Sequence, residues 1–333
     1  MGYARKDIVD TKEVGVYHCV SRCVRRAFLC GWDAYSKKSF EHRREWIRHR
    51  LATLVEIFAI EVIAYAVMSN HVHDLIRSRL DLALLWSDEE VATRWRMLFP
   101  KRRSKSGAPA KPNEEEILAI TSQKKLVATY RERLSSISWF HRCLNENIAK
   151  RANYEDDCTG RFWEGRFKCQ RIYDIAGFVA CSAYIDLNPI RAGIAKTPET
   201  SNHTSIQDRI FEQTKKPSAE HKSWRKIPLV TIPEISGNYL TLTEYLTLVD
   251  ETGRLIVSGK KSISKEIAPI LERLKINQEV WVDKTEFFRN SFRRVVGPEE
   301  RLRAVAKKLK KCWLQGVGAA REMFYGAPVV AVT

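Results

Sequence analysis

The stretch from residue 65 to residue 76 reads YAVMSNHVHDLI and combines apolar residues with a pair of histidines. The apolar residues predict a buried strand. Because side chains alternate between the two faces of a strand, His71 and His73 lie on one face and Asp74 lies on the other. Two imidazoles on one face are half of a divalent-metal site, although two hydrogen-bonded strand histidines give the same pattern. Asp74 is expected to pair with a basic neighbour, unless a bulge turns it toward the metal.

A second segment, residues 180–193, reads ACSAYIDLNPIRAG and predicts a helix that ends at Pro189. Tyr184 and Asn188 are four residues apart, so they lie on the same face of that helix. Two interpretations remain open. Either the two residues belong to a functional site, or Tyr184 is a half-buried helix residue and Asn188 belongs to the C-terminal turn.

The chain is strongly basic, with 57 Lys and Arg against 40 Asp and Glu and a net charge of +17. Such an excess favours a polyanionic partner. Residues 160–171 read GRFWEGRFKCQR and mix cations with aromatic rings. This mixture suits single-stranded nucleic acid, where each stacked base contributes about 1–3 kcal/mol. The alternative is an ordinary strand that buries Trp163 and Phe167 on one face and leaves Arg166 and Lys168 on the other.

In this order along the chain, the segments NHVH, GRFWEGRF and YIDLNPIRAG resemble the single-tyrosine HUH transposases. Within that family they are most similar to the REP-associated tyrosine transposases and their relatives in bacterial insertion sequences. The resemblance covers about residues 10–200. It implies an α+β fold, specifically a ferredoxin-like antiparallel sheet with helices on one face. Strands and helices that alternate over residues 14–172 agree with this class.

The resemblance also implies a reaction. Enzymes of this family cut single-stranded DNA with a tyrosine, which leaves a 5′-phosphotyrosine link and a free 3′-OH. Tyr184 is then the nucleophile. Its metal ion, Mg²⁺ or Mn²⁺, would be bound by His71, His73 and Asn188, and it would polarise the scissile phosphate. Some family members carry a histidine where this chain has Gly165, so Gly165 receives no catalytic role.

The implied partner is single-stranded DNA with a hairpin, and no small-molecule cofactor is expected. DNA contacts are expected from basic and aromatic side chains of the matching segments: Arg161, Trp163, Arg166, Lys168, Arg171 and Arg191. The oligomeric state stays open between monomer and dimer.

Two other functions share parts of this pattern. A catalytically silent or domesticated DNA-binding regulator would keep the fold. A metal-dependent nuclease that uses water would keep the histidines without needing Tyr184. Because the nucleophile and all three expected ligands are present, the sequence favours the transposase, a metal-dependent DNA transesterase that cleaves and rejoins its substrate. Tyr173 is the nearest competing tyrosine.

The composition divides the chain into three parts. Residues 1–196 form the expected transposase domain, with an insertion at about 80–135 in which Glu114 opens a helix. Residues 197–237 are polar and contain several prolines, which predicts a connector. Residues 238–333 predict a basic, mainly α-helical C-terminal domain.

The chain has eight cysteines and no CxxC pair, which predicts free thiols in a reducing cytoplasm. Cys19, Cys23 and Cys30 lie near His18, but their spacing fits no familiar zinc module. No apolar run approaches the roughly 20 residues of a membrane helix. A soluble, cytoplasmic and nucleoid-associated protein is therefore expected.

Overall fold

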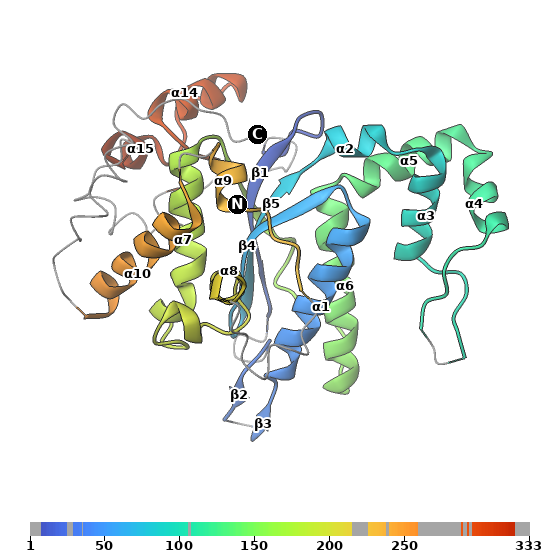
Figure 1. Ribbon diagram of the computed structural model, residues 1–333, viewed down its shortest axis with the longest axis horizontal. Coiled ribbons are helices and arrows are strands. Elements are labelled where there is room, and N and C mark those ends of the chain that lie inside the picture. Colours follow the sequence, from blue (N-terminus) through green and yellow to red (C-terminus); the bar gives the residue numbers. More distant parts are fainter. Residues whose placement is uncertain are drawn as a thin grey trace.

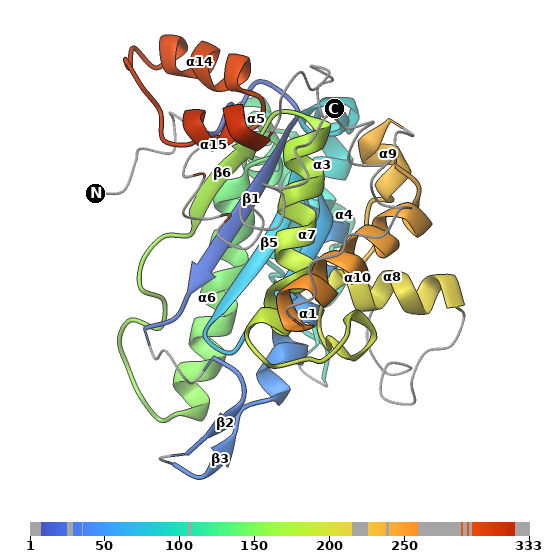
Figure 2. The same cartoon turned by 90° about the vertical axis from the view of Figure 1, so that its left-hand side faces the viewer.

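The computed structural model describes residues 8–24, 29–34, 36–105, 108–214, 226–237, 240–258, 288, 292 and 295–323. Its centre is a five-stranded sheet with the strand order β4-β5-β1-β6-β7. The strands are β1 (Gly15–Arg22), β4 (Ile60–Val67), β5 (His71–Ser78), β6 (Lys168–Ile172) and β7 (Val295–Val296). A separate two-stranded ribbon projects from one end of the molecule (Figure 2), and it consists of β2 (Trp32–Asp33) and β3 (Lys38–Ser39).

The sheet is antiparallel except at one edge. β1 pairs with β5 on one side and with β6 on the other, β4 and β5 form a hairpin, and β7 runs parallel to β6. Helix α1 (His42–Ile57) lies between β1 and β4 in the chain, and α6 (Ile137–Glu155) precedes β6. Two strand–helix–strand units with the first strand placed between the third and fourth form a ferredoxin-like arrangement. The expected α+β class is confirmed.

Helices cover both faces of this sheet (Figure 1). The crossover helices α1 and α6 lie together on one face, as expected. The other face is covered by α7 (Ile175–Arg191) and α10 (Leu242–Ser258). The expectation of helices on one face therefore holds for the crossover helices α1 and α6 but not for α7 and α10. Helices cover both faces because the strands bury apolar side chains on both. Val16 and Tyr17 of β1 point to opposite faces, and both are buried in separate core clusters.

The insertion expected at about residues 80–135 is a group of helices beside α1 and α6 (Figure 1). It consists of α2 (Leu80–Leu85), α3 (Asp88–Leu98), α4 (Glu114–Thr121) and α5 (Lys124–Leu134). Helix α4 begins at Glu114 as predicted, because Asn113 and Glu116 form a reciprocal capping box. Trp95 of α3 stacks on Tyr130 of α5 with ring centroids 3.9 Å apart, which joins the helices to one another.

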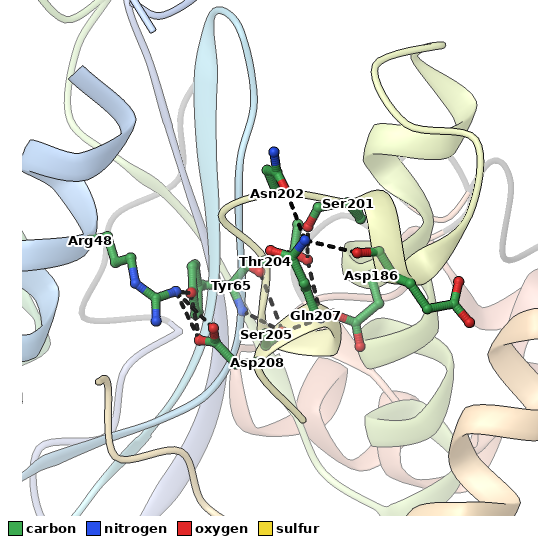
Figure 3. A network of polar contacts seen from close by, with 10 residues as sticks. Arg48, Tyr65, Asp186, Ser201, Asn202, Thr204, Ser205, Gln207 and Asp208 are labelled. Atoms are coloured by element: carbon green, nitrogen blue, oxygen red, sulfur yellow. Dashed lines mark hydrogen bonds and ion pairs between the residues drawn. The ribbon is translucent and has the colours of Figure 1, made fainter. Parts of the chain in front are cut away.

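Residues 197–237, predicted as a connector, pack against the core where they are described (Figure 3). They contain η2 (Pro198–Thr200), α8 (Ser205–Thr214) and α9 (Ile232–Ser236), while residues 215–225 lie outside the described residues. Asp208 of α8 pairs with Arg48 of α1 at 2.9 Å and accepts a hydrogen bond from the Tyr65 hydroxyl of β4 at 2.7 Å. Because this carboxylate is the counter-ion of a buried guanidinium, the segment is a structural part of the core.

The described parts of residues 238–333 also belong to this core. Helix α10 packs on α7, β7 extends the sheet, and α14 (Glu299–Lys308) and α15 (Val317–Met323) complete the same apolar cluster. The expected helical character is present there, whereas residues 259–287 lie outside the described residues. In the described part of the chain, no helix combines the length and the apolar character that a membrane crossing needs.

Asp174 caps the N-terminus of α7 from inside the protein. Its carboxyl oxygen accepts a hydrogen bond from the backbone N–H of Gly177 at 2.8 Å, and the side chain is wholly buried. Burial raises the pKa of Asp174 from 3.8 to about 7. Because the pKa is higher in the folded than in the unfolded state, the stabilisation is complete below the unfolded pKa and is lost as the pH rises through about 7.

Asp174→Asn is therefore expected to remove a pH dependence of stability. The amide still accepts the hydrogen bond from Gly177 but does not ionise. Between about pH 4 and about pH 8, the wild type should lose at most about 4 kcal/mol of stability relative to the variant. Urea denaturation of both proteins at both pH values measures this difference. A difference that stays constant with pH would contradict the raised pKa.

Candidate active site

A chain of hydrogen bonds runs across three strands on the face of the sheet that α7 covers. Nδ1 of His73 on β5 lies 2.9 Å from Nε2 of His18 on β1, and Nδ1 of His18 lies 2.9 Å from Oε1 of Gln170 on β6. All three side chains are buried. The amide nitrogen of Gln170 donates to the backbone carbonyl of Phe292, and this bond fixes the orientation of the amide.

The direction of both hydrogen bonds is set by the side-chain oxygen of Gln170, because this oxygen can only accept. His18 donates to it from Nδ1, so Nε2 of the neutral His18 ring accepts from Nδ1 of His73. This leaves the lone pair of His73 on Nε2, which is the nitrogen that can bind a metal ion. His71 has the same tautomer, with its proton on Nδ1, because Nδ1 donates to the side-chain oxygen of Asn70. The two rings are neighbours on one face, as strand alternation predicts, and stand edge to face with centroids 4.7 Å apart.

Tyr184 and Arg191 lie on one face of α7, next to the histidines. The Tyr184 ring stands edge-on to the His73 ring with centroids 5.4 Å apart, and the tyrosine is 8% exposed. The guanidinium carbon of Arg191 lies 5.3 Å from the centroid of the Tyr184 ring. The structure thus brings the candidate nucleophile beside a candidate metal ligand and a cation.

Asn188 lies near the end of α7, which is longer than the sequence predicts. The helix continues through Pro189 to Arg191, because a proline in the last turn removes only the hydrogen bond to the carbonyl of Ile185. The amide nitrogen of Asn188 donates to the Tyr184 carbonyl at 2.6 Å. Its amide oxygen is therefore the atom that can bind a cation.

The donor atoms of this site fit Mg²⁺ or Mn²⁺. Two imidazole nitrogens and one amide oxygen leave positions for water and for substrate oxygens. His73 is also held by a hydrogen bond from its other ring nitrogen, as metal-binding histidines usually are. His18 and Gln170, which hold it, were not predicted as site residues, because their approach depends on strand pairing that the sequence does not reveal.

Phe288, from the C-terminal region, forms a wall of the site. Its ring stacks on Tyr184 with centroids 5.1 Å apart and stands edge-on to His18 at 6.1 Å. The side chain is wholly buried. No motif marks Phe288 in the sequence, so this contact could not be predicted.

A basic groove of about 170 Å³ lies beside the histidines. Arg22 lines it together with Arg166 and Lys168. Arg22 is directly opposite His71 in the sheet, so the two side chains share a face. Nε of Arg22 is buried and has no hydrogen-bond partner among the described residues. Arg22 was not predicted from the sequence, since its position depends on the register between β1 and β5.

The segment before β6 packs inward instead of extending the sheet. Within this segment, a strand is present only from Lys168 onward. Trp163 and Phe167 are buried and line a cavity of about 470 Å³ beside α6, while Arg166 and Lys168 are exposed. The predicted division of these side chains between two sides is therefore present. The segment serves both the core and the basic groove.

The remaining predicted DNA contacts are not gathered at this groove. Arg161 is exposed, whereas Trp163 is buried and donates from its indole nitrogen to the Asn145 carbonyl at 2.8 Å. Arg171 is buried and pairs with Glu13 at 3.0 Å. Arg171 thus has an internal partner that the sequence did not indicate.

Comparison with known proteins shows one distant likeness. A solved structure described as a REP-associated tyrosine transposase bound to a REP hairpin aligns with a TM-score of 0.37 and 13% sequence identity, over 65% of this chain and 89% of that chain. No family model matches the sequence, and neither does any curated protein.

Proposed function

We propose that this protein is a transposase of the single-tyrosine HUH type, which cleaves and rejoins single-stranded DNA through Tyr184. The contact between Tyr184 and His73 carries this proposal, because the hydrogen-bond chain behind His73 leaves its Nε2 for a metal ion. Arg191 lies at the same tyrosine. The proposed metal ligand His73 and the cation Arg191 thus both lie beside the proposed nucleophile Tyr184. Phosphoryl transfer uses these three kinds of group.

Each residue has a defined role in this reaction. His71, His73 and Asn188 would hold Mg²⁺ or Mn²⁺, and this ion would supply positive charge at the scissile phosphate. The Tyr184 oxygen attacks phosphorus and gives up its proton, while the 3′-oxygen leaves and takes up a proton. The products are a 5′-phosphotyrosine link and a free 3′-OH. Arg191 stabilises negative charge that develops on the phenolic oxygen.

The proposed substrate is single-stranded DNA with a hairpin. The resemblance of the sequence motifs implies this substrate, and the net charge of +17 supports a polyanion. Arg22, Arg166 and Lys168 are placed to bind phosphates beside the histidines. The exposed Arg161 is a further proposed contact, as is Arg191, whose guanidinium lies beside the Tyr184 ring.

Covalent capture tests the proposed function. Labelled hairpin oligonucleotides from the DNA that flanks the gene are incubated with the full chain and Mg²⁺ or Mn²⁺, or with EDTA, and are separated on a denaturing gel. A metal-dependent adduct is expected. Cleavage without an adduct would indicate a nuclease that uses water.

The cover over Tyr184 favours a second candidate, a catalytically silent regulator of the same fold. Tyr184 is 8% exposed and its ring stacks on Phe288, so we propose that Phe288 restricts the access of a phosphate to this tyrosine. Binding of the oligonucleotides without cleavage would favour this regulator. Phe288→Ala then shows whether Phe288 is the reason that no covalent adduct forms. An adduct that forms only in this variant would mean that the Phe288 ring blocks Tyr184.

Arg22→Ala is expected to weaken binding of single-stranded DNA to a similar degree for all sequences. Loss of one phosphate contact should reduce the slope of log K against log salt concentration by about 0.7. Fluorescence anisotropy at several salt concentrations measures this slope. Arg254→Ala is the control, because Arg254 is an exposed residue of α10 that pairs with Asp250. Equal slopes for the wild type and Arg22→Ala would remove Arg22 from the interface.

A further inference from the structure

A second row of metal-binding side chains lies behind the histidines, on the opposite face of the same strands. Asp74 of β5 and Cys169 of β6 are each directly opposite Cys19 of β1. His141 of α6 reaches the row from the covering helix. All four side chains are buried. Because side chains alternate along a strand, the three strand residues each follow or precede a residue of the hydrogen-bond chain on the other face. The neighbouring pairs are Asp74 and His73, Cys19 and His18, and Cys169 and Gln170.

The spacing of Cys19, Asp74 and His141 suits a single ion, and Cys169 lies beside Cys19. One potential ligand atom from each of Cys19, Asp74 and His141 lies within 4.8 Å of the other two. The sulfurs of Cys19 and Cys169 are 3.8 Å apart. Two thiolates that are each about 2.3 Å from a tetrahedral zinc ion are separated by about the same distance.

His141 is oriented as metal-binding histidines are. Its Nδ1 lies 3.0 Å from the carbonyl oxygen of Ile137, which can only accept, so Nδ1 carries a proton. Its Nε2 lies 3.1 and 3.2 Å from the two oxygens of Asp74. The basic partner that the sequence predicts for Asp74 is therefore His141. A lone pair and a carboxylate this close require either a proton, carried by one of the two groups, or a metal ion between them.

We propose that Cys19, Cys169, Asp74 and His141 form a structural site for a divalent ion of the zinc class. The two sulfurs favour zinc over Mg²⁺ or Mn²⁺ as the ion, because thiolate and imidazole ligands select zinc while Mg²⁺ and Mn²⁺ prefer oxygen. Binding releases three protons to solvent: the two thiol protons and the proton that His141 and Asp74 otherwise share. Two thiolates and one carboxylate then leave a single net negative charge around the ion, as in a Cys₃His site.

This site ties three neighbouring strands to α6. The same strands carry His73, His18 and Gln170 on their other face, so the rear ion fixes the spacing of the front hydrogen-bond chain without contact with DNA. His141 also lines the cavity of about 470 Å³ beside α6, which gives the ion a route from the surface. The proposal does not depend on the chemistry at Tyr184.

Cobalt substitution tests the site in the full chain. The protein is reduced, stripped of metal with a chelator and titrated with Co²⁺, which gives a near-ultraviolet charge-transfer band only when thiolates bind it. We expect one tightly bound equivalent with this band in the wild type and in His71→Ala/His73→Ala, which lacks the front ligands. Cys312→Ser, at an exposed cysteine, should also keep the band.

Cys19→Ser is expected to lose the band and Cys169→Ser to weaken it, with circular dichroism as the check of folding. Zn²⁺ should raise the melting temperature of the wild type more than that of either variant. If the variants do not fold, the wild-type titration still decides. Bound Co²⁺ without a thiolate band, or no bound Co²⁺, would overturn the site and leave Asp74 and His141 as an ion pair.

Discussion

Tyr184→Phe is expected to abolish the covalent adduct with DNA while DNA binding remains. The variant keeps the ring that packs against His73 and Phe288, so the fold should not change. Loss of a covalent nucleophile lowers turnover by on the order of 10⁴-fold or more. Denaturing-gel capture measures the adduct, and anisotropy with the same oligonucleotide measures binding.

Tyr173→Phe is the matched control for this experiment. Tyr173 is the tyrosine nearest to Tyr184 in the sequence, but its ring lies 4.7 Å from the guanidinium carbon of Arg171. It should form the adduct at the wild-type rate. An adduct that persists in Tyr184→Phe and disappears in Tyr173→Phe would move the nucleophile to Tyr173.

Asp208→Ala is expected to destabilise the protein by about 3–5 kcal/mol. The Arg48 side chain is 5% exposed and its partner Asp208 is 15% exposed. The variant leaves a buried guanidinium without its counter-ion and the Tyr65 hydroxyl without the acceptor shown in Figure 3. Urea denaturation followed by circular dichroism measures the loss.

Glu212→Ala provides the control on the same helix. Glu212 pairs with Lys226 at 2.7 Å, and these side chains are 61% and 71% exposed. Exposed ion pairs contribute about 0–1 kcal/mol. Similar losses of stability in Glu212→Ala and Asp208→Ala would mean that burial of the Arg48 pair is not what makes it important.

The elements governed by local pattern were predictable. The helix expected to begin at Glu114 is α4, and the strands around the histidine pair are β4 and β5. Periodicity shows which side chains are buried but not what buries them. For this reason, the cover of α7 and α10 on the second face and the packing of residues 197–237 were not predicted.

The candidate site was predictable where residue type and spacing suffice. His71 and His73 share a face because they are two residues apart on a strand, and Asn188 follows Tyr184 by one helical turn. Cys19 shows the limit of such reasoning. It was considered together with cysteines close to it in the chain, but Asp74 and Cys169 are its neighbours in space. Pairing between distant strands cannot be read from spacing in one segment.

The carbonyl that orients Gln170 belongs to Phe292, which is 122 residues further along the chain. Ribosomes make a chain from its N-terminus, so a nascent protein carries all three sequence motifs before it receives this carbonyl or the Phe288 ring. If the protein cuts DNA as proposed, this order of synthesis delays the finished centre until residues 288 and 292 have been made. A gene copy interrupted before codon 288 would encode every recognisable motif and still lack the completed centre.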